Sequence, residues 1–125
     1  RGMSHRNMNR PAMARGGAPS VVVATALTDA VPQLRALVPG LSEADAWKML
    51  GVTPMIGQND VPSEVFTLND ATTLTSFVKS KKVGLVSFWA VNRDRPCGSG
   101  TDGDSCSGVT QQPYDYLKVF TQYTG

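Results

Sequence analysis

Hydrophobic residues recur at helical spacing in the segment TLNDATTLTSFVKSKK, residues 67–82, which is the clearest helix pattern in the chain. One face carries Leu68, Ala71, Leu74, Phe77 and Val78. Thr67 and Asp70 have the three-residue spacing of a capping pair, and lysines at the other end suit the negative end of the helix dipole. The pattern predicts a helix that ends near Lys82.

A second helical face runs through VVVATALTDAVPQLRALV, residues 21–38. Its start is ambiguous because the segment contains Pro32. If Asp29 caps the helix, Pro32 falls in the first turn, where proline is tolerated. If the helix instead begins near Ser20, Pro32 lies inside it and must kink it. The sequence pattern leaves both starts open.

Two shorter helices are predicted at residues 42–50 and 113–125. In the first, Ser42 and Asp45 have capping-box spacing and Gly51 follows as a stop signal. The second, PYDYLKVFTQYTG, has apolar residues at helical spacing. These are Tyr116, Val119, Phe120 and Tyr123.

Between the helices lie two apolar runs, VTPMIG at 52–57 and VGLVSFWAV at 83–91. The second run is continuous and bounded by polar turns, which is typical of a parallel strand buried on both faces. The residues after each run, 58–65 and 92–108, are expected to be loops. Strands that alternate with capped helices predict an α/β fold with right-handed crossovers.

Composition restricts the choice of architecture. With 125 residues, 41% hydrophobic and 18% charged, the chain has room for one ordinary domain and is too apolar for general disorder. No apolar run approaches the roughly 20 residues of a membrane span, and no signal-peptide pattern appears at the start. We therefore expect no membrane partner.

Basic residues gather in the first 15 positions, which contain four of the seven arginines and His5 but no acid. The rest of the chain has eight basic and ten acidic residues, so the net charge of +2 is no argument for a nucleic-acid partner. We expect residues 1–16 to form a flexible basic arm and residues 17–125 to form the folded segment.

Cys97 and Cys106 flank eight residues rich in Gly, Ser and Asp. Such a loop is easily closed by a disulfide, which would indicate an oxidising compartment. Two cysteines without a nearby histidine do not complete a zinc site. The chain also lacks a P-loop and a dinucleotide fingerprint, so we expect neither a metal nor a cofactor.

Candidate chemistry is sparse because the single histidine, His5, lies in the arm and leaves no ordered base for nucleophilic catalysis. Asp60 and Asp94 follow the two apolar runs directly, where α/β folds place their sites. A loop turn, or a salt bridge from either aspartate to Arg93 or Arg95, is the competing interpretation. Trp89 is either a core residue or an indole surface on which a sugar ring stacks.

The segments LGVTPMIGQND (50–60), VFTLNDATTLTSFVKSKK (65–82) and VGLVSFWAVNRDRPC (83–97) resemble the last part of a glycoside hydrolase family 18 catalytic domain. They are most similar to the secreted bacterial chitinases of that family. The ending GVTQQPYDYLKVFTQYTG resembles the closing helix of such domains, so the resemblance extends over residues 17–125.

The resemblance implies a partial (β/α)8 TIM barrel in which residues 52–56 form the seventh strand and 83–91 the eighth. The family cleaves β-1,4-linked N-acetylglucosamine polymers with retention. Trp89 matches the tryptophan that forms the floor under the sugar. Met55, Asn59 and Asp60 match substrate-binding positions at the barrel top. Chitin or an N-acetylglucosamine oligosaccharide is the implied ligand, and a secreted location is implied with it.

The sequence departs from the family at its catalytic motifs. No segment matches the D-x-x-D-x-D-x-E motif that carries the catalytic acid, and residues 1–15 do not match the Met-x-Asp-Tyr motif expected near the start. We therefore expect no catalytic residue in this chain and no hydrolysis by it alone. Two parallel strands leave unpaired edges, so self-association or a complementing chain is also expected, as an alternative role.

Overall fold

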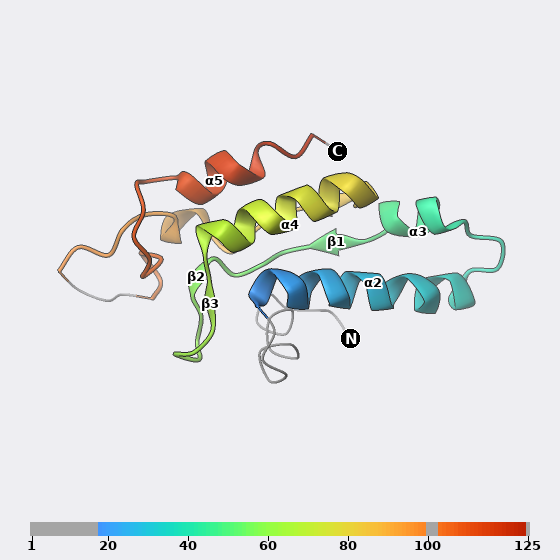
Figure 1. The fold of residues 1–125 in the computed structure, drawn as a ribbon, viewed down its shortest axis with the longest axis horizontal. Helices are drawn as coiled ribbons and strands as arrows, with labels where there is room; N and C mark the ends of the chain where they lie inside the picture. Colours follow the sequence, from blue (N-terminus) through green and yellow to red (C-terminus); the bar gives the residue numbers. More distant parts are fainter. Residues whose placement is uncertain (1–17, 100–102, 125) are drawn as a thin grey trace.

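The computed structural model describes residues 18–99 and 103–124, which contain both helices and strands, as expected for an α/β chain (Figure 1). The expected basic arm, with His5, lies outside the described residues. Within them the helices are α2 (Pro19–Leu37), α3 (Glu43–Lys48), α4 (Leu68–Lys81) and α5 (Asp115–Phe120), with a 3₁₀ turn η1 (Val91–Arg93). The strands are β1 (Gly51–Val52), β2 (Gly57–Gln58), β3 (Val65–Phe66) and β4 (Leu85–Val86). None of the described helices is long and apolar enough to cross a membrane.

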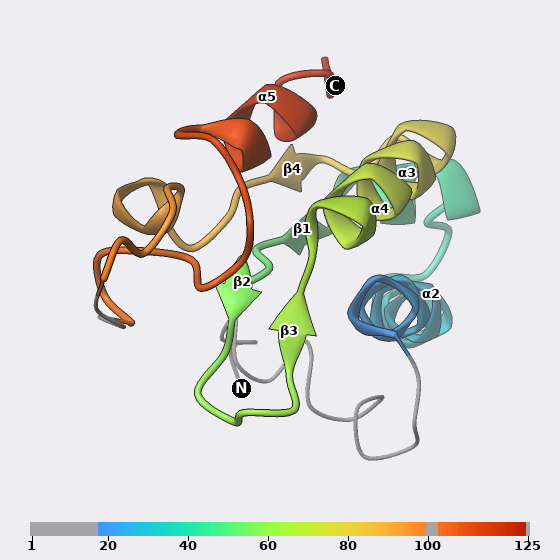
Figure 2. The same cartoon turned by 60° about the vertical axis from the view of Figure 1, so that its left-hand side comes forward.

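The central feature is a parallel pair formed by β1 and β4, with Gly51 opposite Leu85 and Val52 opposite Val86 (Figure 2). The pairing extends beyond these short strands, because the N–H of Trp89 donates to the Pro54 carbonyl and the N–H of Ile56 donates to the Trp89 carbonyl, both at 2.9 Å. The two apolar runs are therefore paired along most of their length. Helix α4 connects them, in agreement with the predicted alternation.

Helix α4 forms where the sequence predicted it, because its end signals are local. The N–H of Asp70 donates to Thr67 Oγ1 at 3.0 Å, and the N–H of Thr67 donates to Asp70 Oδ2 at 2.9 Å, which completes the capping box. Lys82 ends the helix in the left-handed conformation, with φ of 59°. Ala71, Leu74 and Val78 are buried on the predicted face.

Helix α2 begins at Pro19, so the longer of the two open alternatives is correct and Pro32 lies inside the helix. Val23, Leu27 and Val31 recur every four residues and are buried against the core. Pro32 is exposed, so the hydrogen bond that proline cannot donate is missing on the side that faces water. Asp29 is consequently a mid-helix residue rather than a cap.

The other two helices are short. Ser42 caps α3 by accepting a hydrogen bond from the N–H of Asp45 at 3.1 Å. Trp47 on α3 packs edge-on against Phe77 of α4, with ring centroids 5.8 Å apart. Helix α5 has only six residues, but it buries Tyr116 and Phe120 as the helical spacing predicted.

Two expectations for the strands are wrong. Residues 58–65 do not form a simple loop, since β2 and β3 pair in an antiparallel hairpin there. The Gln58 side chain stabilises the turn of this hairpin by donating hydrogen bonds to the carbonyls of Val61 and Pro62. Strand β4 is not buried on both faces, because Leu85 is 62% exposed. In the described part of the chain β4 pairs only with β1.

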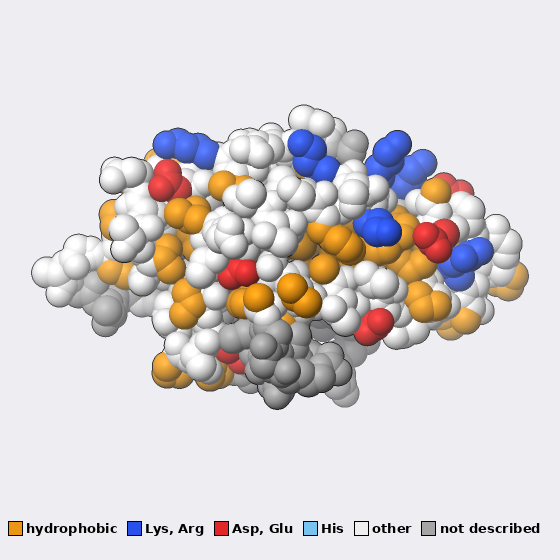
Figure 3. All heavy atoms as spheres, viewed as in Figure 1, with side chains coloured by type: hydrophobic (Ala, Val, Ile, Leu, Met, Phe, Trp, Pro, Cys, Tyr) orange, Lys and Arg blue, Asp and Glu red, His pale blue; other side chains and the backbone are white. Residues whose placement is uncertain are grey.

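The core lies where α2, α3 and α4 pack against the β1–β4 pair, with α5 beside α4. Its aromatic members are Trp47, Phe66, Tyr116 and Phe120. On the face shown in Figure 3, Lys and Arg side chains are dispersed over the helices and apolar side chains lie between them. That face therefore carries no continuous basic patch.

Candidate functional site

The carboxyl ends of β1 and β4 bring Met55 and Trp89 side by side, in an isolated parallel bridge. Met55 is 7% exposed, whereas the Trp89 side chain is 49% exposed. The peptide bond from Trp89 to Ala90 is cis. At this exposure the indole of Trp89 is not a fully buried core side chain.

Asn59 follows β2 and is buried, with 6% of its surface exposed. Its side-chain nitrogen donates to the carbonyls of Met55, at 3.2 Å, and Gly57, at 3.0 Å. These bonds fold the end of the 55–59 segment back on itself. Asp60, the next residue, is exposed.

Met55, Asn59 and Asp60 line one pocket of about 350 Å³. The opposite wall is the disulfide loop. Trp89 is not among the lining residues, so the structure groups three of the four predicted residues around the pocket and places Trp89 beside Met55 on the neighbouring strand. The remaining lining residues are Gln58, Arg93, Cys97, Gly103, Asp104, Cys106, Ser107 and Gly108.

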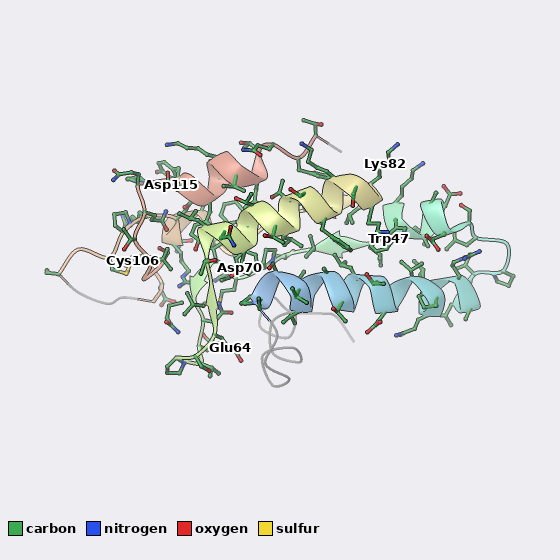
Figure 4. The ribbon with its side chains drawn as sticks, in the orientation of Figure 1. Trp47, Glu64, Asp70, Lys82, Cys106 and Asp115 are labelled. Carbon is green, nitrogen blue, oxygen red and sulfur yellow. A yellow bond between two sulfur atoms is a disulfide. The ribbon has the colours of Figure 1, made fainter. Side chains whose placement is uncertain are left out.

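The predicted disulfide between Cys97 and Cys106 is confirmed. Figure 4 shows Cys106 at the end of the molecule opposite Trp47, close to the hairpin. The loop is fastened to β2 because the N–H of Gln58 donates to the carbonyl of Ser107 at 2.7 Å. The disulfide thus closes the loop that forms one wall of the pocket.

Asp94 is not available for catalysis, and the alternative of a salt bridge to Arg93 or Arg95 is also wrong. Its carboxylate is fully buried and accepts hydrogen bonds from the N–H groups of Tyr116 and Leu117, at 3.0 and 2.8 Å. The side chain of Gln111 donates a third at 2.8 Å. Asp94 therefore caps the start of α5 from a loop 21 positions earlier in the chain.

Arg93 is 1% exposed and is one of the residues that line the pocket. Nη1 donates to the Ile56 carbonyl at 2.9 Å and Nη2 to the Gln58 carbonyl at 2.7 Å. Burial lowers the pKa of Arg93 from its ordinary value, and the nearby groups of Tyr116, Asp104 and Asp60 oppose that shift. The guanidinium stays charged at neutral pH, since arginine is not deprotonated in proteins.

From the sequence, Arg93 was expected only as a salt-bridge partner for an aspartate. Gln58 and Ser107 were not predicted to belong to a site. No local pattern distinguishes an arginine that turns inward from one that faces water. The only sequence feature that could have indicated a site here is a polar residue soon after a predicted strand. Arg93, Asp94 and Arg95 all have this feature, so it does not distinguish them.

The arrangement combines an exposed aromatic face with a pocket that contains amide, carboxylate and thioether groups. These groups suit a ligand that has both an apolar ring face and several hydroxyl or amide groups. In the described part of the chain no three His, Cys, Asp or Glu side chains are grouped to hold a metal ion.

No family model matches the chain. It is 33% identical over 103 residues to a probable bifunctional chitinase/lysozyme of Escherichia coli K12, a match that covers 80% of the chain. It is 42% identical over 64 residues, 51% of the chain, to Endochitinase 11 of Metarhizium anisopliae. The chain spans only 11% and 12% of the lengths of these two curated relatives.

The fold is similar to that of the catalytic domain of a hyperthermophilic chitinase from Pyrococcus furiosus. The TM-score is 0.74 and the identity 34%, over 84% of this chain and 34% of the other. The same values apply to catalytic-site mutants of active domain 2 of the Pyrococcus furiosus chitinase in complex with chito-oligosaccharides. Sequence and fold agree that the chain resembles the C-terminal part of a glycoside hydrolase family 18 chitinase catalytic domain.

Proposed function

We propose that the chain forms part of the sugar-binding surface of a chitinase-type catalytic domain and binds chitin or N-acetylglucosamine oligosaccharides. The observation that carries this proposal is the 49% exposure of Trp89 at the carboxyl end of β4, directly beside Met55. An exposed tryptophan side chain at that edge gains little of the hydrophobic free energy that burial would supply. Stacking under a sugar ring is the use that fits an indole there.

Each of the four residues has a role in this proposal. Trp89 stacks on the apolar face of a sugar ring, and Met55 extends that apolar floor. Asn59 shapes the bend at the end of β2 and contributes amide polarity to the pocket. Asp60 is exposed at the pocket and accepts hydrogen bonds from sugar hydroxyl or amide groups.

In this proposal the chain has no hydrolytic centre of its own. Its sequence contains no D-x-x-D-x-D-x-E motif to supply a catalytic acid. Three carboxylates are buried among the described residues, Glu64, Asp70 and Asp94. Asp70 and Asp94 accept hydrogen bonds from the N-terminal residues of helices, so neither of these two is placed to protonate a leaving group. Asp60 and Asp104 both line the pocket, but neither stands in the motif that provides the acid for retaining hydrolysis.

We place residues 17–125 in a partial (β/α)8 barrel, with the 52–56 run as its seventh strand and the 83–91 run as its eighth. The parallel β1–β4 pair with α4 as the connection supports this assignment. Residues 1–16 remain a separate basic arm in this proposal. A secreted location fits the disulfide, because disulfides persist in oxidising compartments.

The test is binding of an N-acetylglucosamine hexamer by calorimetry, together with a chitin pull-down. Trp89→Ala should weaken binding roughly tenfold through loss of the stacking surface. Tyr114→Ala is the matched control, because Tyr114 is also aromatic and 53% exposed but lies outside the β1–β4 edge and the pocket. Unchanged binding by Trp89→Ala would exclude the stacking role.

Hydrolysis is tested separately with a chromogenic N-acetylglucosamine oligomer. We expect no turnover by the purified chain. Turnover that Asp60→Ala abolishes would contradict the proposal that the chain lacks a catalytic centre.

An alternative function is assembly, with itself or with another chain that completes the sheet. The supporting observation is the apolar surface of β4 and the segment after it, where Leu85 is 62% and Val91 56% exposed. A groove between this segment and α5 is lined mostly by apolar side chains. Exposed strand edges with apolar flanks are sites of chain association.

A further inference from the structure

Arg93 is a buried cation beneath the proposed sugar-binding edge, and none of the roles given above uses it. Its side chain is 1% exposed and comes from η1, four positions after Trp89. Burying a guanidinium is costly unless its N–H groups are well used. Two of its nitrogens are engaged, whereas Nε is buried without a hydrogen-bond partner.

The two engaged nitrogens hold the backbone of the 55–58 segment in an alternating pattern. Asn59 donates to the carbonyls of Met55 and Gly57, and Arg93 donates to those of Ile56 and Gln58. Two side chains therefore satisfy four successive carbonyl groups. Buried carbonyls without donors are strongly unfavourable, so this arrangement favours one conformation of the segment.

The segment needs such support because it changes direction at this point. The N–H of Ile56 donates to the carbonyl of Trp89, in the segment that follows β4, whereas the N–H of Gln58 donates to the Ser107 carbonyl in the disulfide loop. Gly57, between them, has φ of +70°. The rigid fork of a guanidinium reaches two carbonyls two residues apart, which the single ammonium of lysine does not reproduce.

We propose that Arg93 is the positioning residue of the sugar-binding edge: by holding residues 56–58 it sets where Met55, Asn59 and Asp60 lie relative to Trp89. The inference rests on the proposed function, because it assigns to Arg93 the geometry of that same binding edge. Arg93 contacts no substrate in this role. It acts through the backbone that carries the binding side chains.

The experiment compares Arg93→Lys and Arg93→Met with the unaltered chain in hexamer binding by calorimetry. Arg93→Lys keeps the charge but not the fork, and Arg93→Met removes both. Each should bind about tenfold more weakly, because small displacements of binding groups are costly. Arg95→Met is the matched control: Arg95 is exposed, lies in the same loop and donates to Ser105 rather than to the 56–58 backbone. It should bind like the unaltered chain.

A second measurement separates positioning from general loss of structure and needs no ligand. In ¹H–¹⁵N spectra of Arg93→Lys, the side-chain amide of Asn59 and the backbone amide of Gln58 should shift, while the indole N–H of Trp47 in the core should not. Shifts throughout the spectrum would overturn the positioning role in favour of a merely structural one. If Arg93→Met does not fold, Arg93→Lys decides the outcome.

The binding results also separate a failure of the Arg93 inference from a failure of the proposed function. Unaltered affinity in a folded Arg93→Lys, or an equal loss in Arg95→Met, would overturn the inference and leave the proposed function standing. If the unaltered chain binds no hexamer, the proposed function itself fails and the role of Arg93 in sugar binding fails with it.

Discussion

At the scale of single residues, the most informative side chains are polar groups that the fold has buried. Asp94 follows an apolar strand, as a catalytic carboxylate in an α/β fold often does. In the folded chain it is fully buried and accepts three hydrogen bonds, two of them from the first residues of α5. Its position in the sequence indicated a site, but its contacts show a cap.

Asp94→Ala should lower the free energy of unfolding by about 3 kcal/mol, because three buried donors lose their acceptor. Asp115→Ala is the control on the same helix. Asp115 accepts a backbone hydrogen bond from the N–H of Gln112, and its loss should cost about 1 kcal/mol. Urea unfolding measures both, and equal losses would contradict the capping role of Asp94.

Tyr116 links stability to pH. Burial raises the pKa of its hydroxyl above the ordinary value near 10, and that hydroxyl donates to the Phe66 carbonyl at 2.5 Å. Above about pH 10 the unfolded chain loses this proton while the folded chain keeps it. Stability from this group is therefore complete below pH 10 and falls above it, by about 1.4 kcal/mol per pH unit.

The measurement is urea unfolding at several pH values from 8 to about 11.5, with Tyr116→Phe as the control. The variant has no proton to lose at this position, so the difference in unfolding free energy between the two proteins should shrink as the pH rises above 10. A difference that stays constant with pH would show that Tyr116 does not contribute.

At the scale of secondary-structure elements, the site depends on how β2 and α4 are attached to their neighbours. Asp70 is the clearest example, because it closes the capping box of α4 and also accepts hydrogen bonds from Ser20 of α2, at 2.8 Å from Oγ and 3.3 Å from N (Figure 4). One carboxylate thus caps a helix and ties two helices together.

Asp70→Ala should therefore cost about 2–3 kcal/mol of unfolding free energy, since both the cap and the link to α2 are lost. Ser42→Ala is the comparison, because Ser42 caps α3 through a single exposed bond whose loss should cost about 1 kcal/mol. Thermal and urea unfolding measure both. A smaller loss for Asp70→Ala than for Ser42→Ala would show that the link between α2 and α4 contributes nothing.

Strand β2 lies close against the disulfide loop at Gly57. A Cβ at this position would lie 2.2 Å from the Ser107 carbonyl oxygen, and φ is +70°. Gly40 also has a positive φ, +83°, but a Cβ there would meet nothing within 4 Å. Comparison of the two glycines separates backbone strain from steric exclusion.

Gly40→Ala should cost about 1–2 kcal/mol from the left-handed conformation alone. Gly57→Ala should cost more, because the loop must also move away from β2, and its hexamer binding should weaken. Unfolding in urea and calorimetric titration provide the two measurements. Equal unfolding costs in the two variants would mean that the loop moves away from β2 without penalty.

At the scale of the whole molecule, the exposed apolar surface of β4 is the least satisfied feature. The parallel pair has only two strands in the described residues, although parallel sheets are normally covered on both faces. The Pyrococcus furiosus structure matches this chain over only 34% of its own length. The 62% exposure of Leu85 is the clearest sign of this uncovered apolar surface.

We expect the purified chain to self-associate as its concentration rises, as measured by sedimentation velocity. Leu85→Lys should reduce that association, because a charge on an exposed strand disfavours edge pairing. Leu37→Lys is the control, since Leu37 is 79% exposed at the end of α2, away from the sheet. A monodisperse monomer at all concentrations would contradict the assembly role.

The sequence alone determined the features that depend on neighbouring residues. Helix α4 and its cap, the cap of α3, the two apolar runs and the disulfide pairing follow from short-range spacing, and the family resemblance follows from the same segments. The start of α2 could not be decided locally, because Pro32 is tolerated inside the helix only where its missing donor faces water.

Only the tertiary structure decided which polar residues turn inward. Arg93, Asp94 and Arg95 are adjacent and equally polar in the sequence, yet the first holds a backbone bend, the second caps a helix and the third is exposed. Their partners lie 10 to 37 positions away along the chain. The exposure of β4 has the same origin, because it depends on which distant segments pack beside the strand. Residue spacing encodes local hydrogen bonds, whereas burial is a property of the assembled chain.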